Sequence, residues 1–177
     1  MRGLLVGRFQ PFHKGHLSIV KHILQEMDEI IIIIAAAHKS HYQKNPFTAG
    51  ERIEMIRQTM KKELKNPQNV LIIPASNVND NDLWIYHLKR LSPSFDIVYT
   101  NNPLTTTLFK NAGYKVRETP YFHREKYSGS IIRKFMAENN KKWESLVPLS
   151  VKKFLLEINA VTRMRNILAN DKNHSKK

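Results

Sequence analysis

The stretch at residues 7–16, Gly-Arg-Phe-Gln-Pro-Phe-His-Lys-Gly-His, constrains the fold more than any other part of the chain. It follows a short apolar run at residues 4–6, typical of a buried strand, and precedes apolar residues at helical spacing in residues 17–24. This order places the free N–H groups of a helix start above a strand end, where they favour a phosphate. The turn also carries four basic or imidazole side chains and no acidic one: Arg8, His13, Lys14 and His16.

The composition narrows the class of protein. There is no cysteine, which excludes disulfides and thiolate metal sites. The longest apolar run, residues 30–37, is too short to span a bilayer, and no signal-peptide pattern is present, so we expect a cytoplasmic protein without a membrane partner. A net charge of +14, from 29 basic and 15 acidic side chains, indicates anionic partners, either nucleic acid or phosphorylated small molecules.

Strands and helices are expected to alternate along the chain. Strands are expected at residues 2–6, 30–37, 70–75, 95–100 and 114–117. Helices are expected at residues 15–27, 49–64, 82–91, 103–111, 131–139, 150–158 and 160–169, with a cap region at 79–82. The β-branched run at residues 30–37 is typical of a strand buried on both faces, as in a parallel sheet.

This alternation predicts a doubly wound, Rossmann-like α/β fold with a parallel five-stranded sheet and extra C-terminal helices. We expect one domain over residues 1–169 and a flexible basic tail over residues 170–177. Ligands of such sheets bind beyond the carboxyl ends of the strands, at the switch point. Two helix starts are marked by capping signals, Thr48 with Glu51 and Asn102 before Pro103.

The two histidines of the first stretch have more than one interpretation. His13 and His16 lie within one helical turn of each other and could both donate to a phosphate. They could also bind zinc, with a second pair at His38 and His41, but zinc needs a third ligand and no carboxylate follows either pair at a suitable spacing. Ordinary cap or surface histidines are the simpler alternative. Gly15 between them and the strand directly before them favour the phosphate site.

A second anion site is indicated at residues 127–133, Tyr-Ser-Gly-Ser-Ile-Ile-Arg. Ser130 and Arg133 are three residues apart and share a face in a first helical turn. An ordinary serine N-cap is the alternative. Two such helix starts in one α/β domain suggest a polyphosphate held between them, and Arg8 could grip it with two hydrogen bonds.

Other residues have two equally plausible interpretations. Trp84 could stack on a flat ring or pack in the core. Arg124 and Lys126 lie in a basic segment that could close over phosphates or remain a solvated loop.

Taken together, these segments resemble a known family. Residues 7–16 resemble the His-x-Gly-His signature of the nucleotidyltransferase superfamily, and residues 127–133 resemble its second signature, Ile-Ser-x-x-x-x-Arg, with Tyr127 in place of isoleucine. The layout, including Asn-Pro-Phe-Thr-Ala-Gly-Glu-Arg at residues 45–52 and the Leu-Trp pair at 83–84, is similar to the archaeal type of nicotinamide-nucleotide adenylyltransferases. The resemblance covers residues 1–168.

The resemblance implies a reaction in which the 5′-phosphate of nicotinamide mononucleotide (NMN) attacks the α-phosphorus of ATP, giving NAD and pyrophosphate. A phosphate nucleophile is anionic at pH 7, so this chemistry needs positioning and charge stabilisation rather than a general base. Mg²⁺ is expected as the cofactor with ATP, held by phosphate oxygens and water and by few or no protein ligands.

The resemblance also implies residue roles. It gives catalytic roles to Arg8, His13, His16 and Arg133. It gives contacts with ATP and its phosphates to Gly7, Arg8, Phe9, His13, Gly15, His16, Arg124, Tyr127, Ser128, Gly129, Ser130 and Arg133, of which Ser130 and Arg133 hold the outgoing pyrophosphate. It gives contacts with the nicotinamide nucleotide to Gln10, Phe47, Asn81 and Trp84, and it implies a homo-oligomer such as a hexamer.

Three alternatives stay open. The acceptor could be phosphopantetheine or flavin mononucleotide, or the transferred group could be cytidylyl. A basic nucleic-acid-binding protein is a second alternative, although no ribonucleoprotein, zinc-finger or basic-zipper pattern is present. A zinc hydrolase that uses the four paired histidines is the third.

Overall fold

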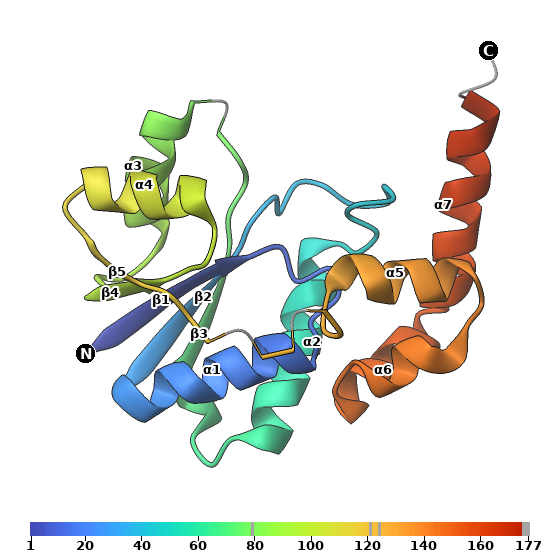
Figure 1. Cartoon of the computed structure of the whole chain (residues 1–177), viewed down its shortest axis with the longest axis horizontal. Helices are drawn as coiled ribbons and strands as arrows, with labels where there is room; N and C mark the ends of the chain where they lie inside the picture. Colours follow the sequence, from blue (N-terminus) through green and yellow to red (C-terminus); the bar gives the residue numbers. More distant parts are fainter. Residues whose placement is uncertain (79, 121, 124, 175–177) are drawn as a thin grey trace.

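The computed structural model describes residues 1–78, 80–120, 122–123 and 125–174 and contains a five-stranded parallel sheet in the order β3-β2-β1-β4-β5 (Figure 1). The strands are β1 (Arg2–Gly7), β2 (Glu29–Ile34), β3 (Val70–Pro74), β4 (Ile97–Tyr99) and β5 (Lys115–Arg117). The α-helices are α1 (Lys14–Glu26), α2 (Ala49–Glu63), α3 (Asn81–Leu91), α4 (Pro103–Asn111), α5 (Gly129–Ala137), α6 (Leu149–Glu157) and α7 (Ala160–His174). Two short 3₁₀ helices, η1 (Pro67–Asn69) and η2 (Lys141–Ser145), complete the elements. The predicted doubly wound α/β fold is therefore confirmed.

Both faces of the sheet are covered, as the β-branched run predicted. Every isoleucine of β2 is 0% exposed, and successive ones point to opposite faces because side chains alternate along a strand. Ile31 and Ile33 pack with residues of α3 and α4, whereas Ile30, Ile32 and Ile34 pack with α1 and α2. Figure 1 shows α3 and α4 on one side of the sheet and α1 on the other.

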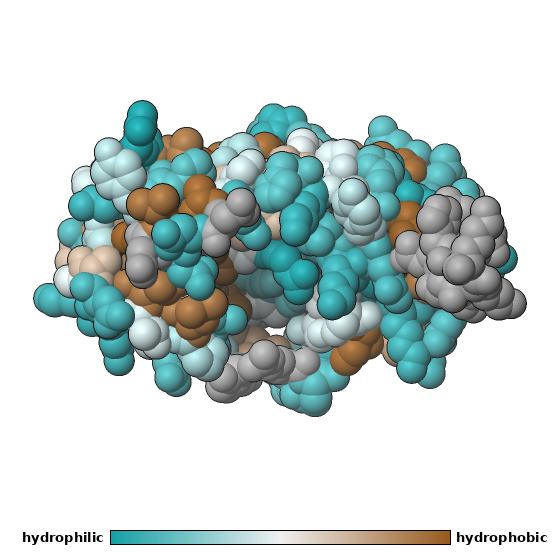
Figure 2. All heavy atoms as spheres, turned by 90° about the horizontal axis from the view of Figure 1, so that it is seen from above, coloured by the Kyte–Doolittle hydropathy of each residue, from teal (hydrophilic) through white to brown (hydrophobic). Residues whose placement is uncertain are grey.

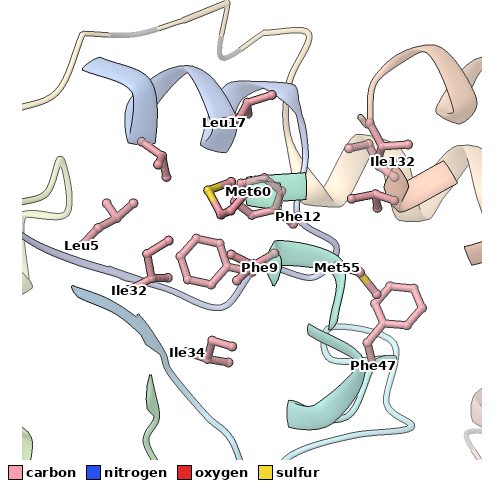
Figure 3. Packing of buried hydrophobic residues seen from close by; sticks show 14 of the residues in the cluster. Leu5, Phe9, Phe12, Leu17, Ile32, Ile34, Phe47, Met55, Met60 and Ile132 are labelled. Atoms are coloured by element: carbon pink, nitrogen blue, oxygen red, sulfur yellow. The ribbon is translucent and has the colours of Figure 1, made fainter. Parts of the chain in front are cut away.

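The larger core continues beyond the sheet into the C-terminal helices. On the side of the sheet that α1 covers, Phe9 and Phe12 of this core lie close to Met60 (Figure 3). Ile132 of α5 and Leu155 of α6 belong to the same buried cluster. Helices α5, α6 and α7 therefore form one body with the sheet domain, beyond the carboxyl end of β1 (Figure 1).

The predicted helix starts are confirmed. Thr48 caps α2 in a reciprocal capping box with Glu51, in which the Glu51 N–H donates to the Thr48 hydroxyl at 3.2 Å and the Thr48 N–H donates to the Glu51 carboxylate at 2.8 Å. Asn102 caps α4 by accepting the Thr105 N–H at 3.0 Å.

Several element boundaries differ from those expected. Strand β2 ends at Ile34 rather than at residue 37, because Ala36 adopts a left-handed φ of 51°. Strand β4 covers only three residues, and α5 begins at Gly129, two positions before the expected start. Helix α7 continues to His174, past the expected end at residue 169. Asn79 of the expected cap region and residues 175–177 of the expected tail lie outside the described residues.

Within the part of the chain that the structure describes, no helix is both long enough and apolar enough to cross a membrane.

Candidate active site

A pocket of about 580 Å³ lies at the carboxyl ends of β1 and β4. The chain continues from β1 to β2 on one side of β1 and returns to β4 on its other side, so this is the switch point of the sheet. The start of α1, the end of β4 and the start of α5 line the pocket, together with Thr119, Pro120 and Phe122. Figure 2 shows this face hollowed near its middle, with hydrophobic residues on the left of the hollow and mainly hydrophilic residues on its right.

The rings of His13 and His16, the two histidines of the first motif, stack on each other at the start of α1. Their ring centroids lie 3.5 Å apart with an angle of 18° between the planes. The His16 N–H donates to Nδ1 of His13 and the His13 N–H donates to Nδ1 of His16, both at 3.3 Å. Each Nδ1 therefore carries a lone pair, which places the ring proton of each neutral imidazole on Nε2. Both rings line the pocket, so the pair offers it two Nε2–H donors.

The histidines are neutral at pH 7. Burial lowers the pKa of His13 to about 4. Burial lowers the pKa of His16 well below its ordinary value, and the neighbouring His13 lowers it further. In this neutral state the pair can donate hydrogen bonds but carries no positive charge.

Glycines let the two motif segments approach each other. A Cβ on Gly15 would lie 2.9 Å from the Cβ of Tyr127, so the start of α1 touches the segment before α5. A Cβ on Gly129 would lie 3.0 Å from the carbonyl oxygen of Gln10. These contacts explain why both positions carry glycine and confirm that the two predicted helix starts meet at one place.

Arg133 links the two starts directly. Its Nη1 donates to the Gln10 carbonyl at 2.7 Å, a contact between residues 123 positions apart. Burial, and to a lesser extent repulsion from Arg8, lower the pKa of Arg133 to about 10. Arg133 is still a cation at pH 7, and the exposed Arg8 adds a second positive charge beside it.

The first turn of α5 separates two hollows. Ser128 and Gly129 line the larger pocket, whereas Ser130 and Arg133 line a second hollow of about 560 Å³ between α5 and α7, together with Lys44. The hydroxyls of Ser128 and Ser130 lie 2.7 Å apart and connect the two sides. The predicted phosphate residues are thus distributed over both hollows rather than gathered in one.

Gln10 and Phe47 are brought together, but in the protein interior. The Gln10 amide donates to the Phe47 carbonyl and accepts the Phe47 N–H, both at 2.9 Å, and the two residues are 3% and 0% exposed. This geometry gives Gln10 the role of fixing the loop before α2. Contact of either residue with the nicotinamide nucleotide stays a prediction.

Trp84 and Asn81 lie apart from the histidines. Trp84 is half-buried on α3, and its ring packs edge-on against Phe109 at 5.7 Å, which is the packing alternative considered from the sequence. Asn81 is exposed at the start of α3. Neither residue lines the larger pocket, so stacking on nicotinamide stays a prediction. Arg124 lies outside the described residues, and Lys126 packs over the ring of Tyr127 at 5.5 Å.

Asn101 is one of several pocket residues that sequence reasoning missed. Asn101 follows β4, and its amide donates to the Thr119 carbonyl at 2.9 Å and accepts the Thr119 N–H at 2.8 Å. This pairing repeats the one between Gln10 and Phe47 and fixes the opposite wall of the pocket. The position directly after a central parallel strand was the available signal.

The donor set does not fit a zinc centre. Among the described residues, no three His, Cys, Asp or Glu side chains lie close enough to hold a metal ion. His38 and His41 are exposed, and the Nδ1 atoms of His13 and His16 accept backbone N–H groups. None of the described residues that line the larger pocket is a carboxylate, which suits a phosphate ligand that brings its own cation.

Comparison with known proteins identifies the family. A cytidylyltransferase-like family model matches residues 4–135. A protein from Archaeoglobus fulgidus is 47% identical over 97% of this chain and 99% of its own length, and one from Thermoplasma acidophilum is 48% identical over 96% and 93%. Both are named nicotinamide-nucleotide adenylyltransferase. The chain belongs to the family of nicotinamide-nucleotide adenylyltransferases. The resemblance inferred from the motifs is thereby confirmed.

A solved structure shares the fold. The crystal structure of a bifunctional NMN adenylyltransferase/ADP ribose pyrophosphatase from Francisella tularensis, complexed with AMP and a manganese ion, superposes with a TM-score of 0.76 at 19% identity. The match covers 97% of this chain and 53% of that one, so this chain spans about half of the bifunctional protein. At this identity the likeness supports the Rossmann-like architecture alone.

Proposed function

We propose that the protein transfers the adenylyl group of ATP to the 5′-phosphate of NMN, which yields NAD and pyrophosphate. Relatives at 42–48% identity over nearly the whole chain, all named for this activity, support the acceptor. The stacked His13 and His16 pair is the observation that carries the reaction class, because it aims two neutral N–H donors into a pocket without carboxylates.

The step is a direct in-line displacement. A phosphate oxygen of NMN forms a bond to the α-phosphorus of ATP while the bond from that phosphorus to the bridging oxygen breaks, and the electron pair leaves with pyrophosphate. The nucleophile is already anionic, so no side chain has to remove a proton. Fixed donors that face the developing charge lower the barrier because they need no reorganisation during the reaction.

The described residues suggest which side chains stabilise the negative charge on each of the reacting phosphate groups. His13 and His16 would donate to oxygens around the α-phosphorus, and Arg8 would contact the phosphates at the reacting junction. Ser130 and Arg133 would hold the outgoing pyrophosphate on the other side of the first turn of α5. Mg²⁺ would enter bound to ATP, because the pocket lining contains no carboxylate to hold it.

The cellular location and the oligomeric state belong to the same proposal. We place the reaction in the cytoplasm and expect a homo-oligomer, such as a hexamer, from the family resemblance. Nucleic-acid binding remains an alternative supported only by the net charge of +14.

Acceptor-dependent release of pyrophosphate tests the function. The purified protein is incubated with ATP and Mg²⁺, with NMN, phosphopantetheine, flavin mononucleotide or no acceptor, and CTP replaces ATP in a parallel set. Release that requires NMN and ATP, with NAD formed in equal amount, is the expected result. Release with another acceptor or with CTP would contradict the substrate, and no release under any condition would contradict nucleotidyl transfer.

A further inference from the structure

Arg52 of α2 is a buried cation that binds carbonyl groups rather than a carboxylate. The side chain is 0% exposed. Its guanidinium donates to carbonyl oxygens of five residues: Thr48 at 3.1 Å, Arg8 at 3.0 Å, Ala35 at 2.9 Å, Ala36 at 3.2 Å and Ala37 at 3.5 Å. The adjacent Glu51 is occupied by the Thr48 N–H and by Arg163. A buried charge without an ion-pair partner is costly, and here dipoles of the backbone stabilise it instead.

The carbonyls that Arg52 binds belong to the edge of the sheet that forms the site. Arg8 directly follows β1, and residues 35–37 directly follow β2. Ala36 has a φ of 51°, a conformation that is unfavourable for a residue with a side chain. Its N–H donates to the Asn77 side chain at 3.1 Å, so this turn is held from two sides. Arg52 therefore joins the two strand ends next to the pocket into one unit.

The turn at residues 8–10 is surrounded by like charges. Arg52 binds the carbonyl of Arg8, and Arg133 binds the carbonyl of Gln10 at 2.7 Å. The Arg8 side chain is close enough to Arg133 to lower its pKa by repulsion. The two guanidinium groups thus hold the backbone of this turn at two successive points, the carbonyls of Arg8 and Gln10.

We propose that Arg52 is a positioning residue of the adenylyl-transfer site, acting through the carbonyl of Arg8. It holds the turn at residues 8–10 so that the side chain of Arg8 and the start of α1 face the phosphates. Arg52 is too deeply buried to touch a substrate, and it is not a catalytic residue. The inference rests on the proposed function, since it assigns a supporting residue to the same site.

The conservative variant Arg52→Lys tests this role. Lysine keeps the positive charge, but its single nitrogen cannot replace Nε, Nη1 and Nη2, which donate to separate carbonyls, so the turn loses part of its anchor. Small misplacements of reacting groups cost up to about 100-fold in rate. We expect kcat/KM for ATP to fall roughly 10- to 100-fold, with a weaker affinity for tripolyphosphate by isothermal titration. The matched control is Arg57→Lys, an exposed site on the same helix paired with Glu54, which should leave both values unchanged.

A purely structural role for Arg52 gives a different result. A folded Arg52→Lys protein with a lowered melting temperature but wild-type kcat, KM and tripolyphosphate affinity would overturn the proposal. If Arg52→Lys does not fold, the wild-type protein provides the test through the Nε–H signals of ¹⁵N-labelled arginine. We expect the Arg52 signal to shift when tripolyphosphate binds while that of Arg57 stays fixed. An unchanged Arg52 signal at saturation would overturn the proposal.

The two proposals can fail separately. If the wild-type protein forms no NAD, the proposed function fails, but tripolyphosphate titration still compares wild type with Arg52→Lys. Equal affinities would then overturn the role of Arg52, whereas a weaker affinity in the variant would preserve it.

Discussion

The neutral histidine pair makes stability depend on pH in a calculable way. The folded protein holds the pKa of His13 at about 4, against an ordinary value of 6.5. Between these values the unfolded chain binds a proton at this position and the folded protein does not, so the free energy of unfolding decreases as the pH falls. The full effect is about 3 kcal/mol, and about 1.2 kcal/mol of it is lost between pH 7 and pH 5.5.

Urea unfolding of wild type and His13→Asn at pH 7 and pH 5.5 measures this effect. Asparagine can still cap α1 through its side-chain oxygen but does not titrate. Carboxylates contribute equally to both proteins, so the difference between them reports His13 together with its effect on the pKa of His16. We expect wild type to lose about 1.2 kcal/mol more than the variant on going to pH 5.5.

His38→Asn is the control, because His38 is exposed and should leave the wild-type pH dependence unchanged. If wild type and His13→Asn lose the same free energy between pH 7 and pH 5.5, burial does not lower the pKa of His13, and its neutral state in the folded protein at pH 5.5 is refuted.

Three further predictions concern the reaction. His16→Ala should lower kcat by about 10²- to 10³-fold, because one fixed donor is lost, and should also lower the melting temperature because the His13 N–H loses its acceptor; a folded variant with wild-type kcat would contradict its role. Trp84→Ala should raise KM for NMN, and should also lower the melting temperature because the contact with Phe109 disappears; an unchanged KM would exclude stacking on nicotinamide. Removal of Mg²⁺ with a chelator should abolish turnover but leave the melting temperature of the ligand-free protein unchanged, and a large drop would indicate a resident structural metal.

The parts of the fold that depend on local pattern could be predicted from the sequence. The run of isoleucines in β2 predicts a doubly covered parallel strand, and Thr48 with Glu51 predicts the start of α2, because both signals act over a few residues. The end of β2 could not be predicted, because residues 35–37 are bent by Arg52, which lies in the following helix. A β-branched run gives no information about such a contact.

The same distinction applies to the site. The positions of His13, His16 and Gly129 follow from a strand, a turn and a helix start, and the structure brings them together as expected. Gln10 was expected to meet a substrate, but a side-chain amide can equally pair with a loop backbone, as it does with Phe47. Which of the two occurs depends on the loop at residues 38–47, whose path no local pattern determines.

The hydrogen bond between Arg133 and the Gln10 carbonyl joins residues 123 positions apart, and the ion pair between Arg163 and Glu51 spans 112 positions. Closing such long loops is entropically unfavourable until many other contacts have formed. Strands β1, β2 and β3 can pair while the C-terminal third of the chain is still unstructured, but the candidate site cannot be complete at that stage, because it includes the start of α5. In a ribosome-bound chain, the site therefore becomes complete only after α5 has left the exit tunnel and docked. The motif at residues 7–16 is among the first segments to be synthesised, yet it is among the last to become functional.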